Sequence, residues 1–512
     1  MTSNETAHRD ARAPGREPAR HGAVPQGKVP PDGPPLLTRE ILSLAAVVVL
    51  GSIMTILDAT IVNVALPTLG RDFGTSISVI QWVPTIYLLT FASVIPASGW
   101  ASERFGARRV WLVSLAVFIA GSLACGLSQS VGELIVFRVV QGLGGGMIMP
   151  VGQAILARAA GPQRMGRVMS IVGVPLLLGP VVGPVIGGAI AGGASWRWIF
   201  FVNVPVGAAA LALAAWLLPA SAPRGRVTLD VPGLALLSGG IAVFLYGLAD
   251  AAQGGSVGAV PVAAIAAGLA LIAVFCRYAL RARQPLIDLR LFARRGFAAA
   301  AGANLVLGIA LFGVALLLPL YLEIVRGRTP LQTGLLLIPQ GLGAALAMPV
   351  AGALTDRIGA RPVVTGGVIL ALAGTGAYTQ IAAGTAYWYL AGALLLIGAG
   401  LGATITPSMA AAFQAIDRSA IPAATAAIST IQRIAGSLGT VLLAVCLQRA
   451  IGAQLPGFRG GITQAAALAA ADPARALPAL ASAFATTFTV ALALTAAGLV
   501  PALLLPRRPA HH

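Results

Sequence analysis

Long apolar segments alternate with short polar segments along most of this chain. Each apolar segment holds about twenty residues, which is the length that an α-helix needs to cross a bilayer. The pattern predicts fourteen spans, at residues 41–66, 79–101, 110–128, 132–156, 169–193, 199–218, 233–250, 257–278, 298–323, 332–354, 363–382, 387–411, 422–446 and 481–505. The chain is therefore expected to be an all-α polytopic membrane protein with fourteen transmembrane helices.

The polar segments between the spans indicate their orientation. Of the 34 Lys and Arg residues, 25 fall on one side of the predicted bundle and seven on the other. Because positive residues accumulate on the cytoplasmic side, we expect both termini in the cytoplasm. Residues 1–40, rich in Pro, Gly and Arg, are expected to form a disordered cytoplasmic tail, and residues 506–512 a second, short one.

One polar loop sequence occurs twice. Gly99–Arg108 reads G-W-A-S-E-R-F-G-A-R, and Gly352–Arg361, 253 residues later, reads G-A-L-T-D-R-I-G-A-R. Repeated halves of six spans are a transporter architecture with the substrate path at their interface. We therefore predict an N-terminal six-helix bundle over 41–218, two inserted helices with basic cytoplasmic loops over 219–297, and a C-terminal six-helix bundle over 298–505.

Residues 171–191 form an uncharged span that is rich in glycine and proline. Small or bending residues recur in it every four positions, as two neighbouring rows: Gly179, Gly183 and Gly187, and Pro180, Pro184 and Gly188. Small residues at this spacing let another helix approach closely within a membrane, and the prolines bend the helix. A tightly packed helix is one reading, and a functional bend is the other.

Composition narrows the class of function. The chain is 57% hydrophobic and 10% charged, whereas a soluble domain averages about 25% charged. Lys28 is the only lysine and the four histidines lie in the tails, so the spans lack the lysine of a nucleotide-binding P-loop and any histidine-based metal site or catalytic triad. We expect no enzyme, no cofactor and no metal. The net charge of +18 is spread over loops, which predicts no nucleic-acid partner.

Several further motifs occur in a fixed order along the chain. They are Leu57–Pro67, the two repeated loops, Arg138–Gly142, Gly179–Gly188, Trp196–Gly207 and Pro319–Glu323. With this set, the chain resembles the fourteen-helix drug:proton antiporter branch of the major facilitator superfamily. Two positions depart from the usual pattern, since Glu103 stands where Asp is usual and Glu323 where Gln is usual. The resemblance implies two six-helix bundles of the major facilitator fold and a proton-coupled exporter that works by alternating access.

The repeated loops are predicted to be gates. Glu103 and Asp356 can pair with arginines or with a helix N-terminus when the inner face closes, and Gly106 and Gly359 would supply the turns. The full set of predicted gating residues is Gly99, Glu103, Arg104, Gly106, Arg108, Gly352, Asp356, Arg357, Gly359 and Arg361.

Asp58 is the leading candidate for proton coupling. It lies well inside the first span, where a carboxylate is costly and functional by default. Arg138 lies at a similar depth in the fourth span. Burial favours the neutral form of a carboxyl group and a nearby arginine favours the ionised form, so a movable pair could bind and release a proton. The alternative is a fixed ion pair. Glu323, near the outer rim, is either a solvated end residue or a second proton site.

Substrate contacts are predicted for residues that could line a cavity between the halves: Trp82, Tyr87, Asn304, Gln340 and Arg433. Aromatic residues at span ends also serve as interface anchors, and Arg433 could instead be held by backbone carbonyls. Both readings stay open for each residue.

The resulting prediction is a multidrug efflux transporter of the bacterial inner membrane that acts as a monomer. Its partners would be the lipid bilayer, protons and small amphipathic, hydrophobic substrates, because the spans offer many apolar and few polar groups. The alternatives are an exporter dedicated to one antibiotic or metabolite, a nutrient symporter, and a non-transporting membrane sensor or scaffold.

Overall fold

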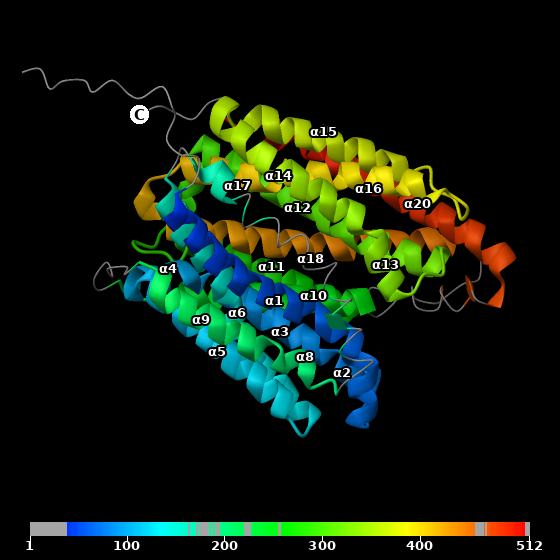
Figure 1. Cartoon of the computed structure of the whole chain (residues 1–512), viewed down its shortest axis with the longest axis horizontal. Helices are drawn as coiled ribbons and strands as arrows, with labels where there is room; N and C mark the ends of the chain where they lie inside the picture. Colours follow the sequence, from blue (N-terminus) through cyan, green and yellow to red (C-terminus); the bar gives the residue numbers. More distant parts are fainter. Residues whose placement is uncertain are drawn as a thin grey trace, which may run out of the picture. The chain divides into compact units, whose positions relative to one another are not determined.

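A computed structural model of the chain describes residues 38–161, 164–169, 195–219, 227–253, 258–455 and 471–506, with isolated positions between them. These residues form helices and connecting turns, and no strand occurs among them. Figure 1 colours the helices along the chain. The predicted tails, 1–40 and 506–512, lie outside the described residues except at 38–40 and 506.

The helices of the first half begin and end close to the bounds of the predicted spans. They are α1 (Arg39–Asp72), α2 (Ile77–Ile80), α3 (Trp82–Val94), α4 (Ala97–Phe105), α5 (Ala107–Leu127), α6 (Val131–Ala160), α8 (Trp198–Phe201) and α9 (Asn203–Leu217). The α3–α4 pair is bent by 57°. Pro96 stands at this bend, where its missing N–H cannot continue the hydrogen bonds of α3.

The two predicted inserted helices are α10 (Val231–Gln253) and α11 (Ala259–Ala279). A short 3₁₀ turn, η2 (Leu289–Ala293), leads into the second half. That half contains α12 (Arg295–Leu320), the π-helical turn η3 (Tyr321–Val325), α13 (Pro330–Leu336), α14 (Ile338–Ile358), α15 (Ala360–Tyr378), α16 (Tyr387–Gly402), α17 (Ile405–Gln414), η4 (Arg418–Ala420), α18 (Ile421–Gln454), α20 (Pro473–Ala497) and α21 (Leu499–Leu504).

The all-α polytopic prediction is confirmed. Among the described residues, twelve helical segments are long and apolar enough to cross a membrane, and the bent α3–α4 pair raises this number to thirteen. Each of them coincides with a predicted span. The remaining predicted span, 169–193, lies mostly outside the described residues.

Some helices begin or end a few residues outside the predicted spans. α1 begins at Arg39, two residues before the first predicted span, because the Thr38 side chain accepts a hydrogen bond from the backbone N–H of Ile41 at 3.4 Å. Both α1 and α18 also continue past the apolar segments, to Asp72 and Gln454. An apolar pattern marks the length inside the bilayer and not where the helix ends.

The two halves repeat the same pattern of helix neighbours. In the first half α5 and α3 both pack on α6, and α1 packs on α9. In the second half α15 and α14 both pack on α16, and α12 packs on α20. The three pairs of the first half thus correspond to the three pairs of the second half, in the order in which the helices follow along the chain. The exact domain boundaries at 218 and 297 stay predictions.

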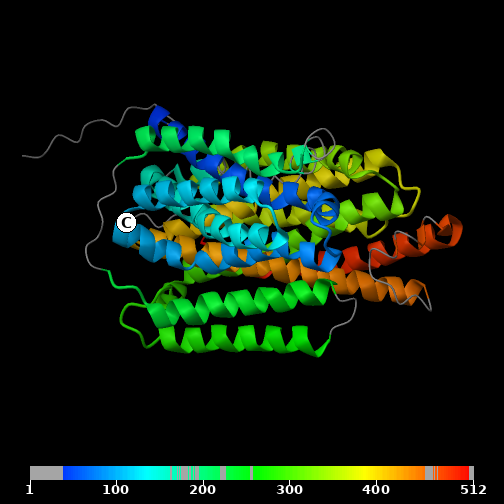
Figure 2. The same ribbon diagram turned by 90° about the horizontal axis from the view of Figure 1, so that it is seen from below.

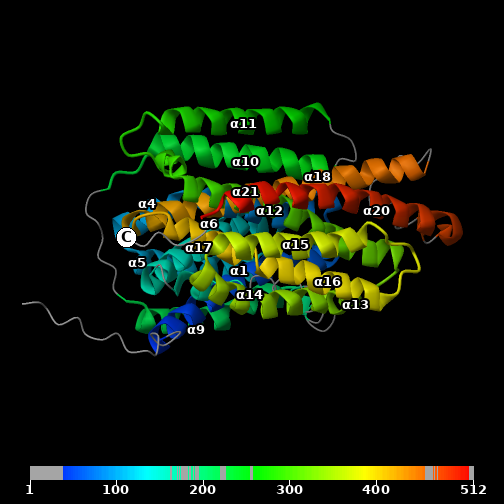
Figure 3. The same cartoon turned by 90° about the horizontal axis from the view of Figure 1, so that it is seen from above.

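The inserted helices α10 and α11 pack on each other and lie side by side along the bundle (Figures 2 and 3). α10 contacts α3 from the first half and α18 from the second. The Trp82 and Tyr246 rings stack at 5.9 Å, and Trp100 Nε1 donates a hydrogen bond to the carbonyl of Val227 at 3.2 Å. The insert therefore contacts both halves, and two aromatic side chains attach it to the first.

Candidate functional site

Asp58 and Arg138 form a buried ion pair in the first half. Nη1 of Arg138 lies 2.6 Å from Oδ2 of Asp58, and neither side chain is exposed. α1 supplies the carboxylate and α6 the guanidinium, as their matching depths in the sequence predicted. A buried charge needs such a partner, because an uncompensated one costs several kcal/mol.

Two amides complete the shell around the Asp58 carboxylate. Oδ1 accepts hydrogen bonds from Nδ2 of Asn203 on α9 at 3.1 Å and from Nε2 of Gln141 on α6 at 2.9 Å. Gln141 also accepts a bond from Nη1 of Arg138 at 2.8 Å, and Asn203 donates to Ser122 at 3.1 Å. The carboxylate thus joins three helices, α1, α6 and α9.

Residues of α3 also contact Arg138. Its Nε donates to the carbonyl of Val83 at 3.3 Å, and its Cζ lies 4.0 Å from the centroid of the Tyr87 ring. The Phe200 ring lies on another side, at 5.7 Å. Nη2 of Arg138 has no hydrogen-bond partner within the described residues. The guanidinium is therefore held by one carboxylate, by the oxygens of Val83 and Gln141, and by two aromatic rings.

Glycines allow the helices around this cluster to approach closely. A Cβ added at Gly121 of α5 would lie 2.7 Å from the backbone nitrogen of Gln141, and one at Gly142 would lie 2.9 Å from the carbonyl oxygen of Tyr87. Both distances are too short for a real side-chain carbon. The glycine-rich sequence of α6 and its neighbour α5 thus brings the Asp58 partners within hydrogen-bonding distance.

Because the cluster contains a titratable carboxyl group, it offers a place for a proton to bind. Its coupling role stays a prediction. Glu323 is not part of it: it lies half-buried in η3, in the second half of the chain. The hydrogen bonds described for the cluster do not include it.

Two of the predicted substrate residues lie close to the ion pair. Tyr87 is buried beneath Arg138, and its hydroxyl donates to the carbonyl of Thr55 at 3.3 Å. Arg433 extends from α18 of the second half, with its Cζ 4.3 Å from the centroid of the Phe91 ring. Both Tyr87 and Phe91 belong to α3.

The other three predicted substrate residues lie apart from that pair. Asn304 is buried in α12, where its Oδ1 accepts a hydrogen bond from Gln432 of α18 at 3.0 Å. Gln340 contacts Gly398 of α16 through its backbone. Trp82 is 39% exposed and stacks on the inserted helix α10. Their substrate roles stay predictions.

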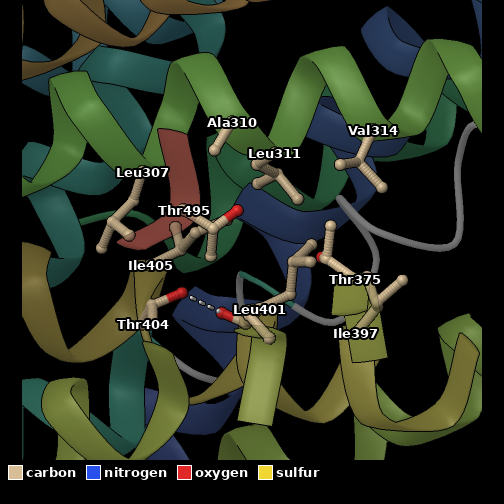
Figure 4. A pocket seen from close by; sticks show the side chains of 11 residues that line it. Leu307, Ala310, Leu311, Val314, Thr375, Ile397, Leu401, Thr404, Ile405 and Thr495 are labelled. Carbon is tan, nitrogen blue, oxygen red and sulfur yellow. Dashed lines mark hydrogen bonds between the residues drawn. The ribbon is translucent and has the colours of Figure 1, made fainter. Parts of the chain in front are cut away.

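A small cavity of about 30 Å³ lies within the second half (Figure 4). Its walls are aliphatic apart from three threonines, Thr375, Thr404 and Thr495, and Thr404 donates to the carbonyl of Leu401 at 3.0 Å. Pockets for drug-sized ligands measure about 300–1,000 Å³. The cavity is too small for such a ligand, and none of the five predicted substrate residues lines it.

The repeated loops contact the opposite half of the molecule. Asp356 accepts a hydrogen bond from the backbone N–H of Gly166 at 3.1 Å and lies 3.7 Å from Nε of Arg167. In the first loop, a Cβ on Gly99 would lie 3.2 Å from the carbonyl oxygen of Pro422, at the start of α18. The two halves are therefore in contact at the end of the bundle that carries both loops.

Gly106 and Gly359 make the turns that the repeat predicted. Each ends one helix and begins the next, with φ of +86° and +89°. Only glycine adopts such a conformation without strain. Arg108 donates a hydrogen bond to the carbonyl of Ala215, and Arg104 lies 5.9 Å from the Phe105 ring. The gating roles of the two loops stay predictions.

Part of the glycine row packs on α1, close to the ion pair. A Cβ on Gly183 would overlap with Thr60, and one on Gly187 would lie 3.1 Å from the carbonyl oxygen of Ile61. These contacts bring the two positions close to α1, and the packing role of the rows stays a prediction. The other four residues of the two rows, Gly179, Pro180, Pro184 and Gly188, lie outside the described residues.

Gln141 and Asn203 were not predicted as members of the site. Gln141 follows Arg138 by three residues and so shares its helix face. Asn203 is an amide inside an apolar segment, where an unsatisfied polar group is costly. The three-residue spacing from Arg138 and the amide inside an apolar segment are the sequence features that identify Gln141 and Asn203 as candidate partners.

The family model described as Major Facilitator Superfamily matches residues 48–440. The chain is 42% identical over 493 residues to the Multidrug resistance protein B homolog of Mycobacterium tuberculosis, covering 92% of this chain and 91% of the relative. It is 32% identical over 406 residues to the Puromycin resistance protein of Streptomyces alboniger, covering 78% and 80%.

The fold is also similar to that of a solved structure, the human organic anion transporter MFSD10 (TETRAN). The TM-score is 0.56 at 17% sequence identity, and the match covers 90% of this chain and 100% of that one. At this identity the likeness concerns the fold alone.

Proposed function

Because the chain belongs to the major facilitator superfamily, we propose that it is a multidrug exporter that exchanges amphipathic, hydrophobic compounds for protons. It is an integral membrane transporter and not an enzyme. The observation that carries the proposal is the buried Asp58–Arg138 pair with its shell of Gln141 and Asn203. A titratable group at this depth gives the transporter a place to bind a proton.

The proposed cycle is alternating access. A proton from outside neutralises Asp58, which weakens its bond to Arg138 and lets one half rock against the other. Contacts that involve Asp356 and Gly99 hold the halves together at one end and would open when the exporter faces the cytoplasm. Because one contact comes from the repeated loop of each half, the two contacts support a rocking motion of one half against the other.

Purified protein in proteoliposomes tests this function. An imposed pH gradient should drive accumulation of a hydrophobic dye without nucleotide. Accumulation that needs ATP and ignores the gradient would contradict the proposal.

A dedicated exporter is the second candidate, because one relative is named for resistance to a single antibiotic, puromycin. Cells with and without the protein, exposed to a panel of unrelated dyes and drugs, separate the two candidates. Reduced accumulation of several unrelated compounds supports the multidrug exporter, and reduction of one supports the dedicated one.

We further propose that both termini are cytoplasmic and that the chain works as a monomer in the bacterial inner membrane. The distribution of Lys and Arg supports the orientation. A cysteine at Gly384, in the turn between α15 and α16, should react with an impermeant reagent in intact cells. One at Gln284, after α11, should react only after permeabilisation, and the reverse result would invert the orientation.

A further inference from the structure

Arg433 extends from the middle of α18 towards the other half of the molecule. Its Cζ lies 4.3 Å from the centroid of the Phe91 ring on α3. In the part of the chain that the structure describes, no carboxylate lies within ion-pair distance of it. A cation inside an apolar span is expensive and is a candidate for function by default.

A second aromatic ring connects this arginine to the proposed proton site. Tyr87 precedes Phe91 by one helical turn of α3, and their ring centroids lie 5.8 Å apart. Arg138 lies 4.0 Å from the Tyr87 centroid. The three distances together place the two guanidinium carbons at most about 14 Å apart.

We propose that Arg433 is the positioning residue through which the second half responds to the charge of Asp58, an inference that rests on the proposed function. While Asp58 is ionised, it compensates the charge of Arg138, and Arg433 remains at Phe91. When Asp58 binds a proton, Arg138 loses its counter-charge and repels Arg433. This repulsion disfavours the contact between α3 and α18, and so favours the other arrangement of the two halves.

The neighbouring groups do not cancel this repulsion. The titratable side chains around Asp58 and Arg138 within the described residues are Tyr87 on α3 and Cys125 on α5, both neutral near pH 7. α9 contributes the amide of Asn203. On the side of Arg433, the adjacent Gln432 is also uncharged.

The size of the effect is sufficient to bias a conformational equilibrium. Two unit charges at most about 14 Å apart, at an effective dielectric constant of about 20, repel enough to change an equilibrium at least about sevenfold. Coupling between two sites is reciprocal, so the return of Arg433 to Phe91 favours release of the proton from Asp58.

Transport by Arg433→Gln and Arg433→Lys tests the proposal. Lys keeps the charge and Gln removes it while keeping a polar side chain. In proteoliposomes, we expect Arg433→Gln to lower the accumulation driven by a pH gradient about sevenfold more than it lowers downhill substrate exchange. Arg433→Lys should retain most of that accumulation.

A conformational measurement adds a second readout. In a background without native cysteines, a cysteine at Ala423, beside Gly99, should be labelled at different rates at acidic and alkaline pH. Asp58→Asn should abolish this difference, Arg433→Gln should reduce it, and Arg433→Lys should keep it.

The outcomes are distinguishable. Normal gradient-driven accumulation by Arg433→Gln would overturn the inference, and so would equal loss of exchange and accumulation in both Arg433 variants, which indicates packing. Failure of the wild-type protein to respond to a pH gradient would instead overturn the proposed function.

Discussion

Oδ2 of Asp58 accepts a hydrogen bond of 2.6 Å from Nη1 of Arg138, and neither side chain reaches solvent. Asp58→Asn removes the titratable group and keeps its size. We expect this variant to bind substrate and to exchange it downhill, but to fail to accumulate it against a gradient, because no proton can be carried. Transport assays in proteoliposomes with and without a pH gradient measure both activities.

Asp72→Asn is the matched control for this experiment. Asp72 is also on α1, but at its end, where it accepts a hydrogen bond from Nε1 of Trp196 at 2.8 Å. This variant should keep gradient-driven accumulation. If Asp58→Asn behaves like the control, Asp58 does not carry the proton and Glu323 is the next residue to test.

Arg138→Gln should destabilise the protein strongly. It leaves the buried Asp58 carboxylate without its counter-charge, which typically costs about 3–5 kcal/mol. Thermal unfolding of the detergent-purified protein should show a clearly lowered Tm. The double variant Asp58→Asn with Arg138→Gln should recover part of this loss, since no buried charge remains. A double variant less stable than Arg138→Gln would argue against a charge effect.

Gly183→Leu should abolish export while the protein still inserts into the membrane. A side chain at this position overlaps with Thr60 of α1, so the two helices must separate. Gly366→Leu on α15 is the control, because nothing lies within 4 Å of a Cβ added there. Export per inserted molecule is the measurement. Wild-type export by Gly183→Leu would mean that this face has room for a large side chain.

Asp356→Asn should weaken the contact between the halves at the repeated loops. It removes the charge that faces Arg167 but can still accept the N–H of Gly166. We expect faster labelling of a cysteine placed at Ala424, which is buried in α18. Asp417→Asn, which removes the exposed pair with Arg294, should change the labelling little. Equal labelling in both variants would exclude a gating role for Asp356.

The sequence predicted the helices well, because a membrane-spanning helix needs an apolar segment of fixed length. It also predicted the pairing of Asp58 with Arg138, since two opposite charges at one depth in a bilayer have few other partners. It did not predict Gln141 and Asn203 as partners, because their contacts depend on how α5, α6 and α9 rotate against one another. Glycine contacts such as Gly121 with Gln141 set that rotation, and their effect requires coordinates.

The contacts of Trp82 are a second feature that the sequence does not determine. Its position near a span end favoured an interface anchor over a residue that lines a cavity. The structure instead stacks it on Tyr246 of α10. Nothing in the sequence shows where the inserted pair packs, because the periodicity of α10 and α11 does not identify their neighbours.

The position of α10 has a consequence for how a hydrophobic compound reaches the transporter from the lipid. A compound dissolved in the bilayer approaches the contact between the halves laterally. α10 packs against both α3 and α18, whose side chains meet at Phe91 and Arg433, so we expect it to keep lipid from that contact. The halves also meet where Gly173 approaches Met348 of α14. We therefore expect a hydrophobic compound to enter from the lipid on one side of the molecule only, at the contact between Gly173 and Met348.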